Sequence, residues 1–176
     1  MGRLGETQDA APVALPQFSA SGALLLRLDP DAMRPPSAQR VRLDGRWLRR
    51  KREFHVTVLG RALGPRLRAL FDEPALQITL AGLDWRVQRG HRYDLLGKMK
   101  PSAHGAVACY SVIEHVQVPG MVALYALLAE QVPDFPPCPP PHVTHYVLGD
   151  RNGIGVPDHD ALAAHRIRGI EEAELA

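Results

Sequence analysis

The chain has 176 residues, of which 45% are hydrophobic and 23% charged, and its formal net charge is +2. This composition is typical of one globular domain with a sizeable core and excludes the disordered and fibrous classes. The mild basic excess permits an anionic ligand but falls short of the strongly basic character of duplex-binding proteins. A small phosphorylated substrate or a short RNA end fits the charge better.

Two cysteines, Cys109 and Cys138, are too few for a disulfide framework. No basic and apolar leader opens the sequence, and the longest uncharged apolar runs, such as 121–129, are far shorter than the roughly 20 residues that span a bilayer. We therefore expect a cytoplasmic protein without a membrane segment, and a monomer with no protein partner.

The first third of the chain predicts a tail, a strand and a hairpin. Residues 1–17 mix Gly, Pro, Ala and polar residues without a period and are expected to form a loose tail. An apolar run at 18–29 predicts the first strand, and the proline-rich stretch 30–39 predicts no regular element. The Asp-Gly pair at 44–45 lies between two alternating runs and predicts a hairpin that leads into "FHVTVLG" at 54–60.

The rest of the chain alternates between strand and helix patterns. Strands are indicated by period-two alternation, and helices by apolar residues on one face or by good helix formers without an internal breaker. In chain order the expected elements are a short helix at 65–73, strands at 76–98 and 105–118, a helix at 120–132, a stiff proline-rich connector at 133–141, a strand within "PHVTHYVLG" at 141–149, a turn at 152–153 and a last helix at 158–167.

Strands and helices thus come in two rounds, and each round contains one His-Val-Thr strand. This order predicts an α+β fold of two lobes, with mainly antiparallel sheets and flanking helices around a central cleft, related by a pseudo-two-fold axis. The single domain is expected to cover 18–168, and 169–176 to form a C-terminal tail.

The repeated His-Val-Thr triplet is the most informative motif. The chain holds eight His and four Thr, so random placement predicts about 0.2 His-x-Thr triplets, whereas two are present. On a strand, residues i and i+2 point to one face, so His55 and Thr57 project together, as do His142 and Thr144. If the two strands lie side by side, two imidazoles and two hydroxyls converge on one cleft.

Such a constellation suits in-line displacement at phosphorus. An imidazole, with an unperturbed pKa near 6.5, serves as base or acid at neutral pH, and a threonine hydroxyl donates to a phosphoryl oxygen. We expect one of His55 and His142 to take a proton from the attacking water and the other to protonate the leaving oxygen. Thr57 and Thr144 are the expected phosphate-binding residues.

Paired His-x-Thr triplets on strands, 87 positions apart, resemble those of the 2H phosphoesterase superfamily, which includes bacterial RNA 2′,5′-ligase-like proteins and cyclic phosphodiesterases. The resemblance implies a bilobal α+β fold and action on RNA-type 2′,3′-cyclic phosphates or 2′,5′ linkages without a metal. It also implies that His55 and His142 are catalytic and that Thr57 and Thr144 bind phosphate. One departure is His145, which follows the second Thr where the family has an apolar residue.

Three other features could form a functional site: a second pair of histidines, the two cysteines and a basic run. His142 and His145 are close in sequence, but an offset of three on a strand puts them on opposite faces, so no metal site is expected. Neither cysteine has an adjacent basic residue, which favours structural thiols. The basic run 46–52 either holds RNA phosphates near the cleft or is a solvated hairpin face, and the sequence does not distinguish the two.

The sequence therefore predicts a metal-independent, cofactor-free phosphodiesterase that hydrolyses the 2′,3′-cyclic phosphate of an RNA end or nucleotide. The alternative is a nucleotide- or RNA-binding module with the same cleft and no useful turnover. With aromatic residues at 6%, a long groove of stacked rings is disfavoured, and recognition of one or two nucleotides is expected.

Overall fold

The structure is a computed structural model and describes residues 14–176. Its strands are β1 (Gln17–Phe18), β2 (Leu24–Leu28), β3 (Arg40–Leu43), β4 (Arg46–Arg50), β5 (Phe54–Leu59), β6 (Gln88–Ser102), β7 (Gly105–Gln117), β8 (His142–Leu148) and β9 (Arg166–Ile170). Its helices are α1 (Pro30–Met33), α2 (Gly64–Leu70), α3 (Glu73–Ala81), α4 (Pro119–Gln131), α5 (His159–His165) and the 3₁₀ helix η1 (Glu172–Leu175).

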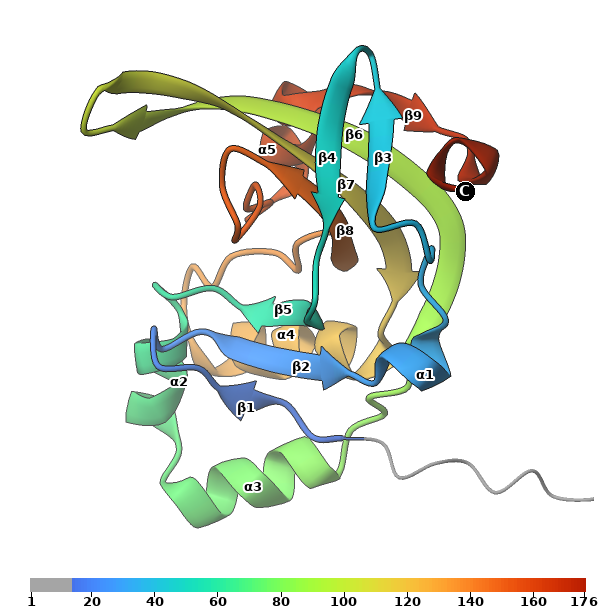
Figure 1. The fold of residues 1–176 in the computed structure, drawn as a ribbon. Helices are drawn as coiled ribbons and strands as arrows, with labels where there is room; N and C mark the ends of the chain where they lie inside the picture. The colour runs from blue at the N-terminus through green and yellow to red at the C-terminus, as the bar shows by residue number, and fades with distance from the viewer. Residues whose placement is uncertain (1–13) are drawn as a thin grey trace, which may run out of the picture.

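All nine strands of the described residues belong to one open antiparallel sheet. Together with the helices, this sheet makes the fold a combination of α and β elements, as predicted. The main path is β1-β2-β5-β8-β7-β6-β9, and the β3–β4 hairpin joins it through pairing of β4 with β8. β5 and β8 meet at one residue pair, Val56 with Val143. In Figure 1, α3 lies beneath β1 and β2, α2 lies at the left of these strands and α4 lies behind β2 and β5, while β6 and β7 form a long curved hairpin above them.

Alternation along the strands explains how the core forms. In β5, Phe54, Val56 and Val58 are buried, while the residues between them are half-buried. The largest buried cluster packs these side chains against apolar residues of the helices, including Leu76 of α3 and Leu124 of α4. A second cluster lies under β3, β4, β6 and β8, and a third joins β6 and β7 to the chain after β8.

The β3–β4 hairpin confirms the Asp-Gly turn. Asp44 has φ 48° and Gly45 has φ 79°, which are the two positive values that a type I′ turn requires. The two strands pair from Leu43 with Arg46 to Arg40 with Arg49. The helix before the connector has the expected form. The connector expected to be extended over 133–141 begins instead with a turn at 133–134, where Asp134 has φ 57°, and only 135–141 lack a regular element.

The expected strand at 76–98 is wrong in its first part, where the chain forms α3. Asp72 caps this helix because its side chain accepts a hydrogen bond from the Ala75 amide at 2.8 Å. Leu76 and Leu80 then lie one turn apart, and both are buried. A short apolar run has both strand and helix periods, and the cap decides between them.

Three further expectations need correction. Residues 30–39, expected to lack regular structure, begin with the one-turn helix α1, which Asp29 caps through the Asp31 amide. The helix expected at 158–167 ends at His165, where β9 begins. The expected C-terminal tail at 169–176 instead completes β9 and forms η1, since Leu175 is buried in the second cluster.

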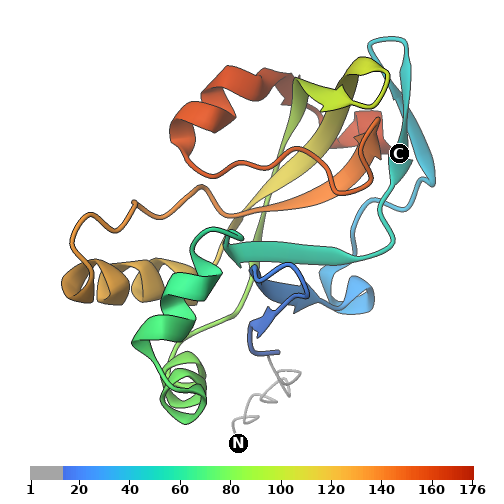
Figure 2. The ribbon, with the colours of Figure 1, turned by 90° about the vertical axis from the view of Figure 1, so that its left-hand side faces the viewer.

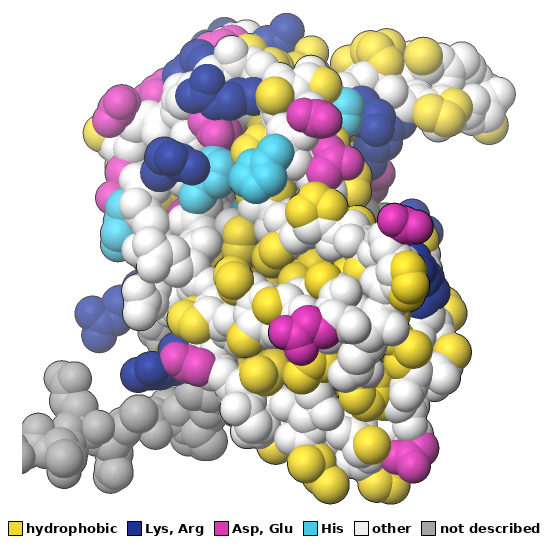
Figure 3. All heavy atoms as spheres, turned by 180° about the vertical axis from the view of Figure 1, so that it is seen from behind, with side chains coloured by type: hydrophobic (Ala, Val, Ile, Leu, Met, Phe, Trp, Pro, Cys, Tyr) yellow, Lys and Arg dark blue, Asp and Glu magenta, His cyan; other side chains and the backbone are white. Residues whose placement is uncertain are grey.

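The expected N-terminal tail at 1–17 lies mostly outside the described residues, although Gln17 already belongs to β1. None of the helices formed by residues 14–176 has the length and apolar character that a membrane crossing requires. Seen from behind, Lys, Arg and His side chains gather in the upper part of the molecule, and hydrophobic side chains occupy much of the middle and lower part (Figure 3).

Candidate active site

The two His-x-Thr triplets lie on β5 and β8, the two strands that meet at Val56 and Val143. Both valines are buried, with exposed fractions of 1% and 0%, whereas the His and Thr on either side of each are half-buried. Val56 and Val143, the middle residues of the two triplets, lie opposite each other in this antiparallel pair. Burial of the two valines therefore turns both His-Thr pairs toward the other face of the sheet.

All four predicted residues line one pocket with a volume of about 460 Å³. Segments 60–63 after β5, 139–140 before β8 and 152–157 after β8 form its walls. Figure 2 shows the connections on either side of β8, 133–141 and 149–157, running one above the other. The structure thus brings the four predicted residues of the two triplets together in one pocket.

Three polar residues of the pocket were not predicted: Arg61, Tyr125 and Asn152. Among the lining residues Arg61 is the one with a permanent charge, and no Asp or Glu lines the pocket, so its electrostatics suit an anion. Tyr125 is buried, which raises the pKa of its hydroxyl and keeps it neutral. Asn152 lies in the predicted turn at 152–153. The sequence predicts that the chain turns there, but it does not show that the turn lines this pocket.

The ring of His142 is fixed by the chain that precedes it. His142 Nδ1 lies 2.9 Å from the Pro140 carbonyl oxygen, which can only accept, so Nδ1 donates its hydrogen. Nε2 of the neutral ring is then free to accept a proton. Burial lowers the pKa of His142, although the bond to Pro140 works in the opposite direction.

His55 is also held in its neutral form. Burial and then the positive charges of Lys51 and Arg27 lower its pKa to about 4, and the neighbouring His142 adds to this effect. Both imidazoles are thus neutral near pH 7 in the absence of an anion. A bound phosphate would favour their protonated forms, because opposite charges stabilise one another.

A further histidine lies beside the pocket on β7. His115 pairs with His142 across the β7–β8 ladder, and its Nε2 lies 2.7 Å from Asp94 Oδ2. Asp94 also accepts a hydrogen bond from Arg166 Nε at 2.8 Å. His115 is therefore held in place by a carboxylate, and its charge is one of the causes that lower the pKa of His142.

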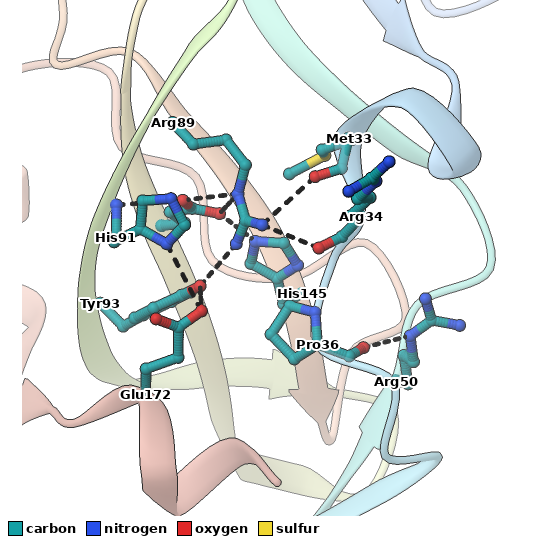
Figure 4. Close-up of polar contacts among 10 residues, drawn as sticks. Met33, Arg34, Pro36, Arg50, Arg89, His91, Tyr93, His145 and Glu172 are labelled. Atoms are coloured by element: carbon teal, nitrogen blue, oxygen red, sulfur yellow. Dashed lines mark hydrogen bonds and ion pairs between the residues drawn. The ribbon is translucent and has the colours of Figure 1, made fainter.

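His145, the departure in the second triplet, points to the opposite side of β8. Its Nε2 donates to Glu114 Oε2 at 2.8 Å, and the two side chains are 1% and 0% exposed. Glu114 in turn accepts from Arg89 Nε, whose guanidinium also donates to the Tyr93 hydroxyl. Figure 4 shows these groups, with Arg89 at the centre of the network.

Within this network Arg89 and Glu114 carry opposite charges and pair with each other on the side of β8 away from the pocket. Burial opposes ionisation of Glu114, but bonds to His145 and Arg89 lower its pKa and keep it a carboxylate. Burial lowers the pKa of His145, which stays neutral. As predicted, His142 and His145 point to opposite sides of β8. Residues 14–176 contain no group of three or more His, Cys, Asp or Glu arranged to hold a metal.

Neither cysteine lines the pocket of the His-Thr pairs. Cys109 is buried in the third cluster, and Cys138 is half-buried in the connector before β8. Burial raises the pKa of Cys138 to about 11, so little thiolate is present at neutral pH.

The basic run 46–52 lies on β4 and the residues after it. Arg50 donates to the Pro36 carbonyl, and Arg46 stacks over the Tyr110 ring at 4.5 Å. Trp47 and Arg49 instead line a second hollow, of about 370 Å³, to which Arg151 also contributes, while the next residue, Asn152, lines the pocket of the triplets. In comparisons with known proteins, the chain matches no protein-family model, no curated protein and no solved structure.

Proposed function

We propose that this protein is a phosphodiesterase that hydrolyses the 2′,3′-cyclic phosphate of an RNA end or nucleotide by two-histidine acid–base catalysis, without a metal. The observation that carries the proposal is the convergence of His55, Thr57, His142 and Thr144 on one pocket that contains Arg61 and no carboxylate. Two imidazoles related by a local two-fold axis can address opposite sides of a phosphorus atom.

The proposed reaction uses His55 as the base. Burial, and then the charges of Lys51 and Arg27, disfavour the protonated form of His55, so its ring is available to take a proton from water. The water oxygen forms a bond to phosphorus, and the bond from phosphorus to the 2′ or 3′ oxygen breaks. The product is a phosphate monoester, with its negative charge held by Arg61 and the two threonine hydroxyls.

His142 is the proposed acid. Its Nδ1–H already donates to Pro140, an interaction that also stabilises the doubly protonated ring. A phosphate in the pocket raises the pKa of His142, so that Nε2 carries a proton to deliver to the leaving oxygen. In this proposal the molecule is arranged as two lobes about the local axis at Val56 and Val143, which would place one catalytic His in each lobe.

The test is a panel of substrates with product analysis: four nucleoside 2′,3′-cyclic phosphates, a 2′,5′-linked dinucleotide and ADP-ribose 1″,2″-cyclic phosphate. The protein is first treated exhaustively with EDTA. We expect at least one cyclic phosphate to be opened to a monoester at an unchanged rate after treatment. Activity that disappears and returns only with a divalent ion would contradict the metal-free mechanism, and binding without turnover on every compound would favour the RNA- or nucleotide-binding module.

A further inference from the structure

The hollow beside the active site combines an exposed aromatic ring with positive charge. Trp47 is 58% exposed, whereas the other tryptophan, Trp85, is 2% exposed and donates to the Leu80 carbonyl at 2.7 Å. The hollow is lined by Trp47, by Arg40 and Arg49 of the β3–β4 hairpin, and by Arg151 of the loop after β8. None of these three arginines forms an ion pair within residues 14–176, so their charges are available to a ligand.

One carboxylate lines the hollow, and it is already engaged. Asp150 Oδ2 lies 2.6 Å from Lys100 Nζ, and its Oδ1 accepts from the Asn152 amide at 2.8 Å. Lys100 Nζ also donates to the Gly153 carbonyl at 2.7 Å. Asp150 therefore holds the loop in place. Its negative charge is paired with Lys100 and does not neutralise the three arginines.

The hollow and the active-site pocket lie on the same face of the sheet. Arg49 is paired with Val147, and a methyl group built on Gly153 would lie 3.5 Å from Val147 Cγ1 and 3.2 Å from Thr144 Cγ2. The 150–154 loop therefore crosses this face between the two sites, with Arg151 on one side and Asn152 on the other.

The distance along β8 fits a nucleic acid strand. From Thr144 to Leu148 the strand advances about 13 Å at 3.3 Å per residue. A single strand of a few nucleotides covers such a span. Stacking of a base on an aromatic ring, with arginines at the flanking phosphates, is the usual way in which proteins hold single-stranded nucleic acid.

We propose that Trp47, Arg40, Arg49 and Arg151 form a subsite for an upstream nucleotide of an RNA strand whose 3′ end occupies the active-site pocket. The base stacks on Trp47, and the phosphates on either side of it contact the arginines. The direction of the strand rests on the proposed function, because a 2′,3′-cyclic phosphate is found at a 3′ end. The preferred substrate is then an oligonucleotide, and a mononucleotide engages only half of the surface.

Binding is measured first, with a readout that does not need turnover. The probe is a tetraadenylate with a 3′-phosphate, and the signal is tryptophan fluorescence, in which exposed Trp47 is the ring that a ligand can reach. We expect strong quenching, and we expect Arg49→Gln to weaken binding about tenfold and to reduce the salt slope of log Kd by about 0.7. Arg92→Gln is the matched control, since Arg92 is exposed, carries the same charge and lines neither site.

Kinetics then separate this subsite from the active site. Trp47→Ala should raise KM for the tetranucleotide with a 2′,3′-cyclic end about tenfold and leave kcat/KM for adenosine 2′,3′-cyclic phosphate unchanged. Equal effects on both substrates, or quenching that is the same in Arg49→Gln and wild type, would overturn the subsite. Quenching without turnover of either substrate would retain the subsite and reject the hydrolase. Turnover without quenching would retain the hydrolase and reject the subsite.

Discussion

At the residue scale, the division of labour between His and Thr makes the first prediction. His55→Ala and His142→Ala should each lower kcat by about 10² to 10⁴, the range for a positioned acid or base. Thr57→Ala and Thr144→Ala should cost less and mainly raise KM, since each removes one donor to the phosphate.

Circular dichroism provides the control for these four variants, because each changed side chain is only half-buried and the fold should survive. Near-native turnover of both His variants on every substrate would remove the basis for acid–base catalysis.

The second prediction concerns pH. A base must be neutral and an acid protonated, so kcat/KM should fall at low pH as His55 charges and at high pH as His142 loses its proton. Because burial and neighbouring charges lower the pKa of His55 to about 4 and burial lowers that of His142, the maximum should lie below the ordinary histidine range near 6.5. The kcat profile should lie at higher pH, since bound phosphate raises both pKa values.

The measurement is kcat/KM and kcat for a cyclic nucleotide from about pH 3 to 9.5, a window that extends below the pKa of about 4 of His55 and above the unperturbed histidine pKa. The two limbs report the pair, because the charge of His142 acts on His55. A flat profile, or a single limb in the unmutated protein, would mean that the two histidines do not work together.

How far sequence predicts the site is clear from these residues. The four residues of the triplets could be predicted because the two-residue period of a strand fixes which side chains share a face. The structure has both triplets on strands, so this local rule applies. Arg61 and Tyr125 carry no motif and enter the pocket from the segment after β5 and from α4. Their roles depend on how these elements pack against β5 and β8, which no local pattern records.

At the scale of elements, β8 has two faces with different duties. One face carries His142 and Thr144 of the pocket, and the other anchors the strand through His145, Glu114 and Arg89. Glu114→Gln should destabilise the protein by about 3 kcal/mol, because it removes a fully buried carboxylate and leaves the partly buried guanidinium of Arg89 without its counter-ion. Urea unfolding measures the loss.

Glu172→Gln is the matched control for this change. Glu172 touches the rim of the same network through the Tyr93 hydroxyl, but its side chain is 55% exposed. Its replacement should change the free energy of unfolding by less than about 1 kcal/mol. Equal losses in the two variants would show that burial of Glu114 is not what makes it important.

Elements also show where prediction from sequence fails. The predicted β3–β4 turn is correct because an Asp-Gly pair readily adopts the two positive φ values that this turn requires. α3 was missed because its apolar residues suit either period and its Asp72 cap lies outside the alternating run. η1 was missed because its burial depends on Leu175 reaching a cluster built from β3, β4 and β6, far away in the chain.

At the scale of the whole molecule, the histidines set a pH dependence of stability. Burial lowers the pKa of His55, His142 and His145 in the folded state, so below about pH 6.5 the unfolded chain binds more protons. The free energy of unfolding should therefore fall as pH drops from 7.5 to 5, before the carboxylates titrate. Urea midpoints at three pH values test this, and His55→Gln should show a smaller decrease.

The single pair between Val56 and Val143 joins residues 87 positions apart. Contacts of such long sequence separation close large loops and form late, after local hairpins and helices. The pocket cannot exist in any partly folded chain in which β6 and β7 have paired but β5 has not yet reached β8. Recovery of turnover during refolding should therefore coincide with the last, global phase, so that catalysis reports completion of the fold.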